Sequence, residues 1–372
     1  MVSTSKAENP KLIDVISALQ RLLREHQKWL LLIGTGPSMA VNQNMGMGAL
    51  REHLLSDSDL NACAGWDVIA ERLRINSDLE QALTGVELNQ ELLTAIPQSA
   101  GNFVARQDAK YRDALLTGDI DWPCSSLLRI LVQRLPRSSP RLPIVTPNYD
   151  LFIEYACSRM GIRYTTGYVG GALKRPDWNA ARDSLFQMET ATEKGKRRNI
   201  RVPVSSVEIM KVHGSINLFE SPCGNIIESD IWTRSYPDTY HRLLAPPGDP
   251  KNHAVTENRE AWFAEADRSV RAANAFLVIG YGFNDPHIHK IIEEKAIAGS
   301  PLIVLTRDAS AILDKLSAIG ENIWVLTGAK DADDNTIETA TRVKNRALPG
   351  KIEIENERIW SSDMFVSKVM GE

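Results

Sequence analysis

The sequence predicts an α/β fold with a doubly wound, Rossmann-like parallel sheet that is interrupted by a helical insertion or subdomain. Short apolar runs of strand length recur along the chain, and in its second half they alternate with segments of helical spacing. Alternation of this kind is typical of parallel strands joined by crossover helices that cover both faces of a sheet. A long stretch of the first half shows helical spacing alone, which predicts the insertion.

The size and composition of the chain fit one or two globular domains. At about 100–200 residues per domain, 372 residues form either one large domain with insertions or two domains. The 43 basic and 47 acidic residues give a formal charge of −4, which argues against a globally basic nucleic-acid binder but not against a local basic patch. No apolar run approaches the roughly 20 residues of a membrane span, and no basic-then-apolar leader is visible. We therefore expect a cytoplasmic protein without membrane contact.

The spacing of the cysteines is also informative. Cys63, Cys124, Cys157 and Cys223 are scattered, and no two of them form the C-x₂₋₄-C pair that starts a structural zinc site. A chain of this length needs no disulfide staples. The cysteines therefore predict no zinc and a reducing compartment.

The first strand is predicted close to the beginning of the chain. Apolar residues at helical spacing over 11–28 predict an amphipathic helix, and this leads into Trp29–Ile33, an apolar run with the length of a buried strand. Gly34-Thr35-Gly36-Pro37-Ser38 follows at once. A strand that ends in glycines is where an α/β protein commonly binds its ligand.

Residues 60–140 are predicted to form the helical insertion. Apolar residues recur there at three-to-four-residue spacing, and no strand pattern is convincing. The expected helical segments are Trp66–Leu73, Leu79–Ile96, Asn102–Leu116 and Ser125–Leu135.

The strand signal returns after the insertion. Leu142–Thr146 has the composition of a strand and is followed by a helical segment over 151–160. Further strands are predicted at Val207–Val212, Ala275–Ile279, Pro301–Leu305 and Ile323–Leu326, with helices at 286–298, 309–318 and 334–346. On this basis we expect residues 1–59 and 141–330 to form the α/β core and residues 331–372 to form a C-terminal extension.

Three other segments leave more than one interpretation open. Residues 168–206, which contain the basic run 194–201, fit either a solvated loop or a contact with a partner or a phosphate backbone. Residues 232–262 carry little periodicity and are expected to form an ordered lid or loop. The apolar clusters Ile359-Trp360 and Met364-Phe365-Val366, like the helical insertion, belong either to the core or to a contact surface.

Two of the predicted strands in the first part of the chain end in turns with candidate binding groups. Gly34-x-Gly36 lets a backbone approach a pyrophosphate, which the N-terminus of the next helix attracts, although similar turns serve folds that bind no nucleotide. A dehydrogenase is disfavoured because Met39 stands where the third glycine of its fingerprint belongs. Thr146-Pro147-Asn148-Tyr149-Asp150 fits a ligand loop or a helix cap.

Two later strands end in a similar way. His213-Gly214 follows Val207–Val212, where the imidazole would project into a ligand crevice, although a lone His is often structural. Gly280-Tyr281-Gly282-Phe283-Asn284-Asp285-Pro286-His287 follows Ala275–Ile279 and opens a helix at the proline. The joint occurrence of four such turns favours one ligand site at the carboxyl edge of the sheet.

These turns, taken in order, resemble those of the sirtuin family, and more closely its divergent bacterial branch associated with antiphage defence. Gly34–Ser38 resembles the Gly-Ala-Gly-x-Ser phosphate loop, Thr146–Asp150 resembles Thr-Gln-Asn-Ile-Asp, and His213-Gly214 matches the His-Gly pair. Gly280–Pro286 resembles the Gly-Tyr-Ser/Gly-Phe/Leu-x-Asp-Pro turn of the defence branch. Leu302–Leu305 with Thr306 stands where the family has its late adenosine-side strand.

Two departures limit what the resemblance implies. Sirtuin deacylases carry a four-cysteine zinc module after the His, a stretch in which this chain has only Cys223. They also carry an Ile-Pro-Asp-Phe-Arg segment after the phosphate loop, where this chain reads Val41-Asn42-Gln43-Asn44-Met45-Gly46. These departures put the zinc module and the acyl-lysine channel in doubt, and leave NAD binding and glycosidic cleavage as the implied chemistry.

The resemblance implies a role for each strand end. Asn148 would orient the ribose and the attacking water, and His213 would act as general base, for which an ordinary pKa of about 6.5 suits neutral pH. The diphosphate would lie on the Gly34–Ser38 loop, and the adenosine near Gly280–Asp285 and Thr306. The residues expected to bind NAD are Gly34, Thr35, Gly36, Ser38, Thr146, Asp150, Gly214, Gly280, Tyr281, Gly282, Asn284, Asp285 and Thr306.

The leading hypothesis is an NAD⁺ glycohydrolase that releases ADP-ribose and nicotinamide and depletes NAD as the effector of an antiphage defence system. An NAD-dependent protein deacylase, and a non-catalytic NAD or ADP-ribose sensor and assembly module, stay open as alternatives. A nuclease is disfavoured because no carboxylates cluster for a metal pair. The resemblance also implies a homo-oligomer and a partner such as a HerA-type hexameric ATPase or an Argonaute-like sensor.

Overall fold

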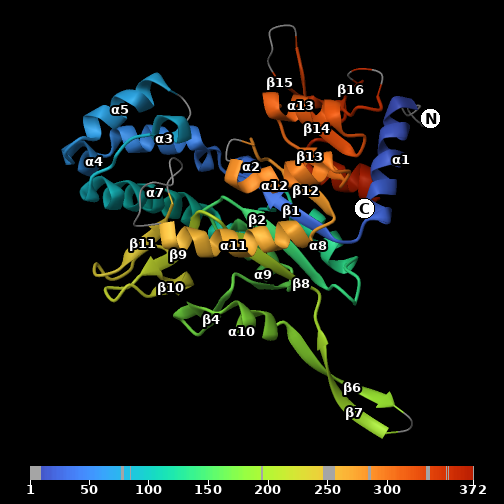
Figure 1. The fold of residues 1–372 in the computed structure, drawn as a ribbon, viewed down its shortest axis with the longest axis horizontal. Helices are drawn as coiled ribbons and strands as arrows, with labels where there is room; N and C mark the ends of the chain where they lie inside the picture. The colour runs from blue at the N-terminus through green and yellow to red at the C-terminus, as the bar shows by residue number, and fades with distance from the viewer. Residues whose placement is uncertain are drawn as a thin grey trace.

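A nine-stranded sheet forms the centre of the protein (Figure 1). The computed structural model describes residues 10–76, 79–83, 85–193, 196–245, 256–283, 286–331, 336–348, 350 and 352–371. The strand order in the sheet is β16-β15-β14-β13-β12-β1-β2-β8-β3. The strands are β1 (Trp29–Ile33), β2 (Arg141–Thr146), β3 (Arg163–Thr165), β8 (Ser206–Lys211), β12 (Ala275–Ile279), β13 (Leu302–Leu305), β14 (Ile323–Lys330), β15 (Thr336–Lys344) and β16 (Ile352–Ile354).

The sheet is parallel from β14 to β3 and antiparallel at its β15–β16 edge. β1 lies beside the central strand β12 and pairs with it from Trp29 opposite Ala275 to Ile33 opposite Ile279. All five residues of β1 are buried, as expected for a parallel strand whose two faces are both covered. The predicted α/β fold with a doubly wound parallel sheet is therefore confirmed, with an antiparallel edge added.

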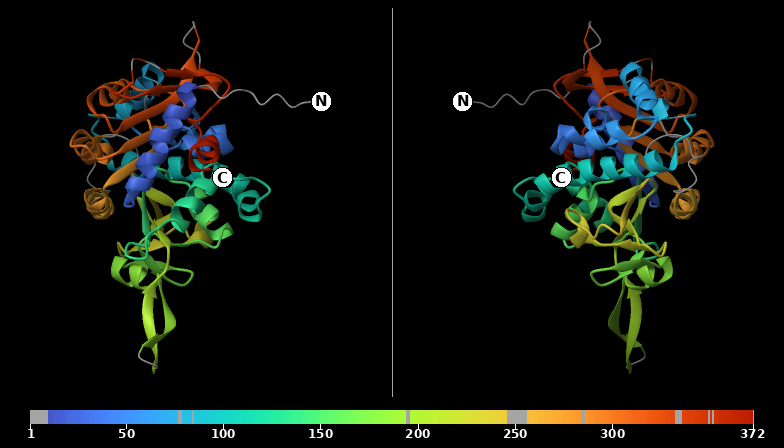
Figure 2. Two further views of the ribbon diagram at one scale, coloured as in Figure 1. Left: turned by 90° about the vertical axis from the view of Figure 1, so that its right-hand side faces the viewer. Right: turned by 90° about the vertical axis from the view of Figure 1, so that its left-hand side faces the viewer.

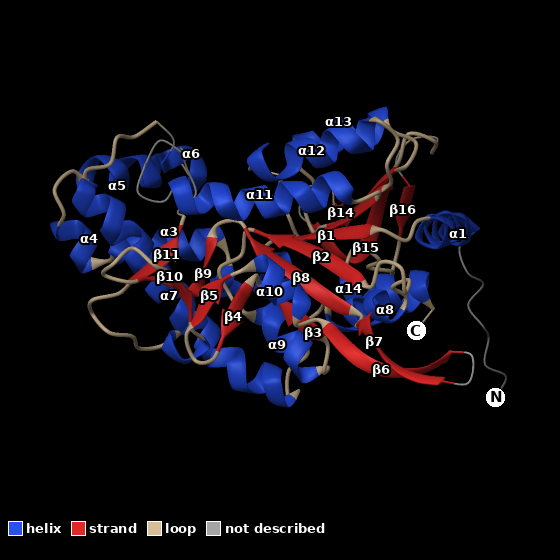
Figure 3. Cartoon of the chain, turned by 60° about the horizontal axis from the view of Figure 1, so that its bottom comes forward, coloured by secondary structure: helices blue, strands red, loops and turns tan. Residues whose placement is uncertain are grey.

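Helices cover both faces of the sheet (Figure 3). Leu30 and Leu32 point to the face covered by α11, α12 and α13, whereas Leu31 and Ile33 point to the face covered by α1, α8 and α9. None of the helices described is long and apolar enough to cross a membrane. These helices are α1 (Pro10–Glu25), α8 (Ser125–Gln133), α9 (Phe152–Arg159), α11 (Thr256–Ala272), α12 (Pro286–Ile297) and α13 (Ala311–Ile319).

A helical block lies between β1 and β2 in the chain and has an apolar cluster of its own. Its longest helix, α7, runs unbroken over 28 residues from Gln90 to Thr117. The predicted division into helices over 79–96 and 102–116 is wrong, because the break falls before Asn89, whose side chain accepts a hydrogen bond from Leu92 N (2.9 Å). The other helices are α2 (Gly36–Val41), α3 (Met47–Ser56), α4 (Ser58–Ala62), α5 (Trp66–Ile75) and α6 (Leu79–Leu83).

A second sheet of five strands, in the order β11-β9-β10-β5-β4, packs beside the helical block and was not predicted. β9 is buried along nearly its whole length although Ser215 and Asn217 interrupt its apolar pattern. Residues 232–262, expected as a lid or loop, contain β11 and the first turns of α11, and residues 246–255 lie outside the described part. The strands are β4 (Tyr168–Gly170), β5 (Lys174–Pro176), β9 (Gly214–Glu220), β10 (Ile226–Glu228) and β11 (His241–Leu244).

An antiparallel hairpin of β6 (Phe186–Glu193) and β7 (Lys196–Pro203) projects from the body of the protein (Figure 2). The expected loop over residues 168–206 is therefore wrong, since the segment holds strands and the helix α10 (Trp178–Asp183), whereas most of the described hairpin residues are solvent-exposed as that interpretation expected. Thr190, Thr192 and Ile200 are β-branched, which favours strands over an irregular loop. Lys194 and Gly195 of the basic run lie outside the described residues.

The C-terminal residues join the core. The predicted helix over 334–346 is wrong because β15 occupies most of it, and the β-branched residues Ile337, Thr339 and Thr341 favour a strand. Ile359 and Phe365 are fully buried and pack into the core on the α1 side of the sheet, so the contact-surface interpretation of their clusters is also wrong. The short helix α14 (Ser362–Phe365) contacts α8, and the π-helical segment Val366–Met370 that follows it packs against α1.

Candidate functional site

The four turns singled out in the sequence lie at one edge of the central sheet. They follow β12, β1, β2 and β8, which are neighbours in the sheet, and all four strands are parallel, so their carboxyl ends face the same way. Val212 N donates to Thr146 O (3.1 Å), and Ile216 N donates to Tyr149 O (3.0 Å). The turn that carries His213 therefore runs alongside the loop that carries Asn148.

The glycines of the first turn allow two backbones to touch. A Cβ on Gly34 would lie 2.6 Å from the Cα of Tyr281, and a Cβ on Gly36 would lie 2.6 Å from the Cα of Gly280. The amides of Gly34 and Gly36 donate to Ile279 O (2.9 Å) and Gly280 O (3.0 Å). The Gly-x-Gly pattern is thus needed for packing between strand ends, and these two amides are already engaged. Thr35, between them, is half-buried.

Ser38, Asn148 and Asp150 form a buried hydrogen-bonded group, which we call the strand-end cluster. Ser38 Oγ donates to Asp150 Oδ2 (2.9 Å), and Asn148 Nδ2 donates to Gly34 O (2.8 Å) and Ser38 Oγ (3.4 Å). Asp150 Oδ1 also accepts from Phe152 N (3.1 Å), the first residue of α9, although the N-cap position itself is held by Leu151. Asn148 instead reaches across to the first strand.

One atom of the strand-end cluster is left without a partner. Asn148 is 4% exposed, and its side-chain oxygen Oδ1 is buried with no hydrogen-bond partner among the residues described. Thr146 fixes the backbone below it, because its Oγ1 donates to Ile33 O (2.7 Å) and accepts from Asn148 N (3.1 Å). The amide is therefore held in place while its buried oxygen keeps an unused acceptor position.

Lys211 and Glu154 support the cluster from below. Lys211 Nζ lies 3.0 Å from Glu154 Oε1, the side chains of both residues are 6% exposed, and the ammonium also donates to Asp150 O. Burial raises the pKa of Glu154 to about 7, although the Lys211 charge opposes the rise. Sequence reasoning gave these two residues no role, although a lysine inside an otherwise apolar strand was a signal that it needs a buried partner.

Asp108 on α7 holds the end of the same loop. Its Oδ2 accepts from Leu151 N (2.9 Å) and its Oδ1 from Tyr155 Oη (2.7 Å). Burial raises the pKa of Asp108 to about 6, against the lowering effect of these hydrogen bonds. No sequence pattern identified it, since it stands on the buried side of a helix 40 positions before Asn148.

His213 is 7% exposed and its ring meets Phe263 edge-on, with 6.0 Å between ring centroids. Gly214 follows with φ +81°, in the left-handed region that favours glycine. A Cβ there would lie 3.2 Å from the carbonyl carbon of Leu243 in β11. The His-Gly pair thus sits where the two sheets meet.

The turn after β12 is tightly packed. Gly280 has φ +57° and Phe283 has φ +59°, an unusual conformation for a residue with a side chain, and Phe283 is fully buried. Tyr281 Oη lies 3.3 Å from His289 Nδ1, whereas Gly282 is exposed. Asn284 and Asp285 lie outside the described residues.

Thr306 follows β13 and lies next to this turn in the sheet. Its amide donates to Leu326 O (3.1 Å) and its Oγ1 to Asp308 O (3.3 Å), and the residue is half-buried. The edge formed by the predicted residues therefore extends over β8, β2, β1, β12 and β13 in sheet order.

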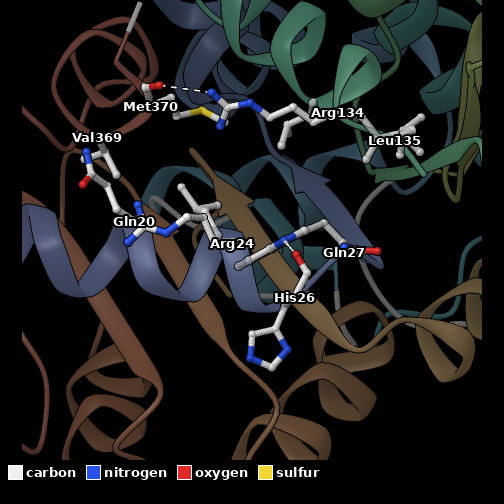
Figure 4. A pocket seen from close by; sticks show the side chains of 12 residues that line it. Gln20, Arg24, His26, Gln27, Arg134, Leu135, Val369 and Met370 are labelled. Carbon is white, nitrogen blue, oxygen red and sulfur yellow. Dashed lines mark hydrogen bonds between the residues drawn. The ribbon is translucent and has the colours of Figure 1, made fainter.

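Two partly open pockets lie near the sheet. A cavity of about 390 Å³ between α1, α8 and the C-terminal residues is lined by Trp29 and Leu142, at the amino ends of β1 and β2, so it faces away from the strand-end cluster (Figure 4). Figure 4 shows Arg24, His26 and Arg134 around it, with Arg134 bonded to Met370 O. A second cavity, of about 300 Å³, is lined by Lys211 and Ser215 and lies beside the cluster.

The residues described contain no group of three or more His, Cys, Asp or Glu side chains arranged to hold a metal ion. All four cysteines are free, and Cys124 and Cys157 are buried in the core. Burial raises the pKa of the Cys124 thiol to about 12. The chemistry available at the strand ends is therefore that of amide, hydroxyl, carboxylate and imidazole groups.

Comparison with known proteins gives one family. The model of the SIR2-like domain matches residues 143–330, about half of the chain. Among solved structures, a Sir2 enzyme described for its mechanism and regulation is 12% identical, with 83% of this chain and 91% of that chain covered and a TM-score of 0.41. A Sir2 homologue–NAD complex is 12% identical over 84% of this chain and 87% of that chain, with a TM-score of 0.41. No curated protein matches the chain.

Proposed function

Since the chain belongs to the SIR2-like domain family, we propose that it binds NAD⁺ at the carboxyl edge of the central sheet and hydrolyses it to ADP-ribose and nicotinamide. The proposed binding residues are those predicted from the sequence at the ends of β1, β2, β8, β12 and β13. Three of these ends carry side chains that can hydrogen-bond to NAD⁺ or accept a proton: Ser38, Asn148 and His213. The reaction needs water as its only co-substrate.

The buried oxygen of Asn148 is the observation that carries the proposal. A buried acceptor without a partner costs about 1–3 kcal/mol, so its retention favours a ligand that donates a hydrogen bond to it. The side-chain nitrogen is held by Gly34 O, which fixes the direction of the oxygen. A ribose hydroxyl of NAD⁺ is such a donor. Asn148 would then hold the sugar without taking part in proton transfer.

The proposed reaction breaks the bond between the anomeric carbon of the nicotinamide ribose and the pyridine nitrogen. The bonding electron pair returns to the nitrogen, nicotinamide leaves as a neutral molecule, and positive charge spreads over the sugar ring. A water molecule adds to the anomeric carbon and gives one proton to His213, which passes it to solvent. Positioning supplies much of the rate, since the leaving group needs no protonation.

The engaged glycine amides refine the predicted phosphate loop. Because Gly34 and Gly36 donate to the β12 end, we assign the diphosphate to the remaining polar groups of the loop, Thr35 and Ser38. Ser38 is 1% exposed and already bonded to Asp150, so its contact would be a shared hydrogen bond. The adenosine is proposed to lie toward Gly280–Gly282 and Thr306.

A second candidate, NAD-dependent deacylation, is favoured by the cavity beside Lys211 and Ser215. Its lining includes the aromatic side chains of Tyr168, Trp178 and Trp262, which suit an aliphatic acyl chain. Trp262 precedes Phe263, whose ring meets His213. An acyl group bound there would approach the same imidazole.

We extend the proposal to the role of the reaction in the cell. The resemblance to the antiphage branch favours an effector that depletes NAD, acts as a homo-oligomer, and is held in check by a partner such as a HerA-type hexameric ATPase. The fully buried Ile359 and Phe365 remove the C-terminal clusters from the candidate contact surfaces. The helical block and the projecting β6–β7 hairpin remain the candidates.

The test is nicotinamide release from NAD⁺ by the purified full chain, followed by chromatography, with and without an acetylated peptide. We expect release without peptide, a loss of about 100-fold or more in His213→Ala and Asn148→Ala, and no loss in the control Asn225→Ala, whose residue is exposed. Release only with peptide would establish the deacylase instead. Tight NAD⁺ binding with no release in any condition would favour the sensor.

A further inference from the structure

A groove runs between α7 and the segment from Thr233 to Arg242. None of the strand-end residues lines it. It encloses about 920 Å³, within the size range of small-molecule sites. One wall is a single face of α7 and the other is the chain that leads into β11. We call it the α7 groove.

The α7 groove concentrates positive charge. Arg106 and Lys110 line it from α7, Arg234 and Arg242 line it from the other wall, and Asp238 is the one carboxylate among the described residues that line it. In a chain with a net charge of −4, such a local excess of cations is notable. Arg106 and Lys110 are exposed, and in the described parts of the chain neither is paired with a carboxylate. Burial lowers the pKa of the nearby His53, and the Arg106 charge lowers it further.

Arg242 is the buried cation of the groove. It is 4% exposed, its guanidinium donates to Ile216 O and to Thr233 O (3.1 Å), and it lies over the rings of Phe219 and Tyr236 at 5.3 and 5.0 Å. No carboxylate among the described residues forms an ion pair with it, and its Nε has no hydrogen-bond partner there. Charged side chains are almost never so buried unless they are paired. The missing partner points to an anionic ligand.

The other lining residues suit a base and a sugar. Tyr236 and Tyr240 are half-buried on the groove wall, where their rings pack against Phe219 and Trp232, and the exposed part of each ring is left to contact a base. Asn102 on α7 offers an amide group, and the amide of Gln98 donates to Tyr236 Oη. Arginine and lysine together are the usual ligands of phosphate groups, since the guanidinium binds two oxygens and the ammonium acts as a point charge.

We propose that the α7 groove binds a free nucleotide with at least two phosphate groups, and that this ligand regulates the site at the strand ends. The phosphates lie against Arg106, Lys110, Arg234 and Arg242, and the base lies against the tyrosines. The binding half of the proposal stands on the groove alone, whereas the regulatory half rests on the proposed hydrolysis of NAD⁺.

Hydrogen bonds link both walls of the groove to segments that flank the strand-end cluster, which gives the regulation a physical path. Lys110 Nζ donates to Gln107 Oε1 (2.9 Å), and the same oxygen accepts from Asn42 Nδ2 (3.3 Å), at the end of α2. Asp108, the next residue of α7, accepts a hydrogen bond from Leu151 N.

The opposite wall reaches the same loop from the other side. Arg242 donates to Ile216 O, and Ile216 N donates to Tyr149 O, next to Asn148. A nucleotide that draws the two walls together therefore acts on the Asn148 loop from both sides.

Binding is tested by calorimetric titration of the full chain with ADP, GDP and inorganic pyrophosphate. The variant Arg106→Ala/Lys110→Ala removes two exposed cations and leaves Arg242 in place, since removing the buried residue risks the fold. The control is Arg137→Ala/Lys315→Ala, which removes two exposed cations away from the groove. We expect the groove variant to lose affinity at least tenfold, the control to keep it, and Asn148→Ala to keep it, which separates the groove from the strand-end site.

Three results would overturn the binding proposal: no binding of any probe at millimolar concentration, equal affinity in the groove and control variants, or loss of binding in Asn148→Ala. Tighter binding of a single-stranded oligonucleotide than of ADP or GDP would replace the free nucleotide by a nucleic acid. The unfolding midpoint of each variant, followed by circular dichroism, shows whether the fold is intact.

Regulation is tested by nicotinamide release with and without the bound probe. We expect a change of at least threefold that disappears in the groove variant. An unchanged rate with bound nucleotide would reject regulation and leave binding standing. A protein that binds nucleotide in the groove but releases no nicotinamide would instead count against the proposed hydrolysis.

Discussion

The strand-end cluster and the α7 groove differ in what their polar groups do for the fold. In the cluster, Ser38, Asn148 and Asp150 bond to one another and to the main chain of neighbouring strands, and only Asn148 Oδ1 is left over. In the groove, Arg106 and Lys110 are exposed, and Lys110 bonds only to Gln107 on its own helix among the residues described. The cluster is therefore part of the structure as well as a candidate site, whereas the exposed cations of the groove serve the fold very little.

This difference teaches how the two sites respond to mutation. Removing a group that supports the cluster should lower the free energy of unfolding together with activity, because the same bonds serve both. Removing a cation from the groove should change binding while the stability hardly moves. Measurements of unfolding free energy therefore separate the two kinds of site.

The largest loss of stability is expected for Lys211→Met. The substitution leaves Glu154 buried without its partner, and removing one member of a buried ion pair costs about 3–5 kcal/mol. The pKa of Glu154 is already raised to about 7 and rises further without the ammonium. At low pH the carboxyl group of Glu154 is then neutral, and burying it destabilises the fold less than burying the carboxylate. The loss of unfolding free energy should therefore be larger at about pH 8.5 than at about pH 6.

Urea denaturation at the two pH values measures this effect. The control is Lys315→Met, which removes an exposed lysine from α13 and should leave the unfolding free energy within about 0.5 kcal/mol. An equal loss for Lys211→Met at both pH values would show that Glu154 does not titrate in this range.

The next effect is expected for Gly34→Ala. The new methyl group would lie against the main chain of Gly280 and Tyr281, where no flexible side chain can move aside, and we expect a loss of about 2–3 kcal/mol. Gly48→Ala is the matched control, since nothing lies within 4 Å of a Cβ there, and alanine favours the helix α3 by about 0.5–1 kcal/mol. Thermal unfolding of both variants tests it. A Gly34→Ala protein as stable as wild type would refute the close-packing role.

A smaller effect, with a defined pH dependence, is expected for Asp108→Asn. The pKa of Asp108 is raised from 3.8 to about 6, so the folded state holds this proton where the unfolded state has released it. This contribution to stability is present at low pH and is lost as the pH rises from the unfolded pKa of 3.8 to the folded pKa of about 6. The asparagine variant lacks it, so its deficit should be about 1–2 kcal/mol larger near pH 4.5 than near pH 7.

Unfolding free energies over this pH range test the prediction. Asp67→Asn, at an exposed position on α5, is the control and should show no added pH dependence. A deficit of Asp108→Asn that grows with pH would mean that the carboxylate is stabilised, not destabilised, by its surroundings.

The elements of the fold differ in how well the sequence alone predicts them. The parallel core was predictable, because fully buried strands such as Trp29–Ile33 are continuous apolar runs that end in glycine turns. The second sheet was not, because β9 mixes Ser215 and Asn217 with apolar residues, and their partners become evident only when the strands pair. The helix predicted over β15 is wrong because its apolar spacing also fits a helix, whereas its β-branched residues favour a strand.

The same contrast between local and long-range signals holds for the residues of the two sites. Asn148 stands in a short turn beside a strand, so local spacing identified it, and the site assignment itself stays a prediction. Asp108 and Lys211 act through partners 43 and 61 positions away, which no local pattern encodes. The α7 groove joins α7 to Arg242, more than 130 positions later, through the packing of α7 on the second sheet. Long-range pairing, and not residue type, decides which charged groups meet.

The smallest effect is expected for Arg106→Ala/Lys110→Ala in the absence of nucleotide. Exposed substitutions change stability by about 0.5 kcal/mol or less, and relief of repulsion among the groove cations should make the variant slightly more stable at low salt. The gain should vanish at about 1 M salt, where charges are screened within about 3 Å. Chemical denaturation at two salt concentrations, beside Arg137→Ala/Lys315→Ala, measures it. A loss above about 1 kcal/mol would make these cations structural, like the strand-end cluster. A small gain would mean that the fold tolerates their repulsion, as expected of residues kept for a ligand.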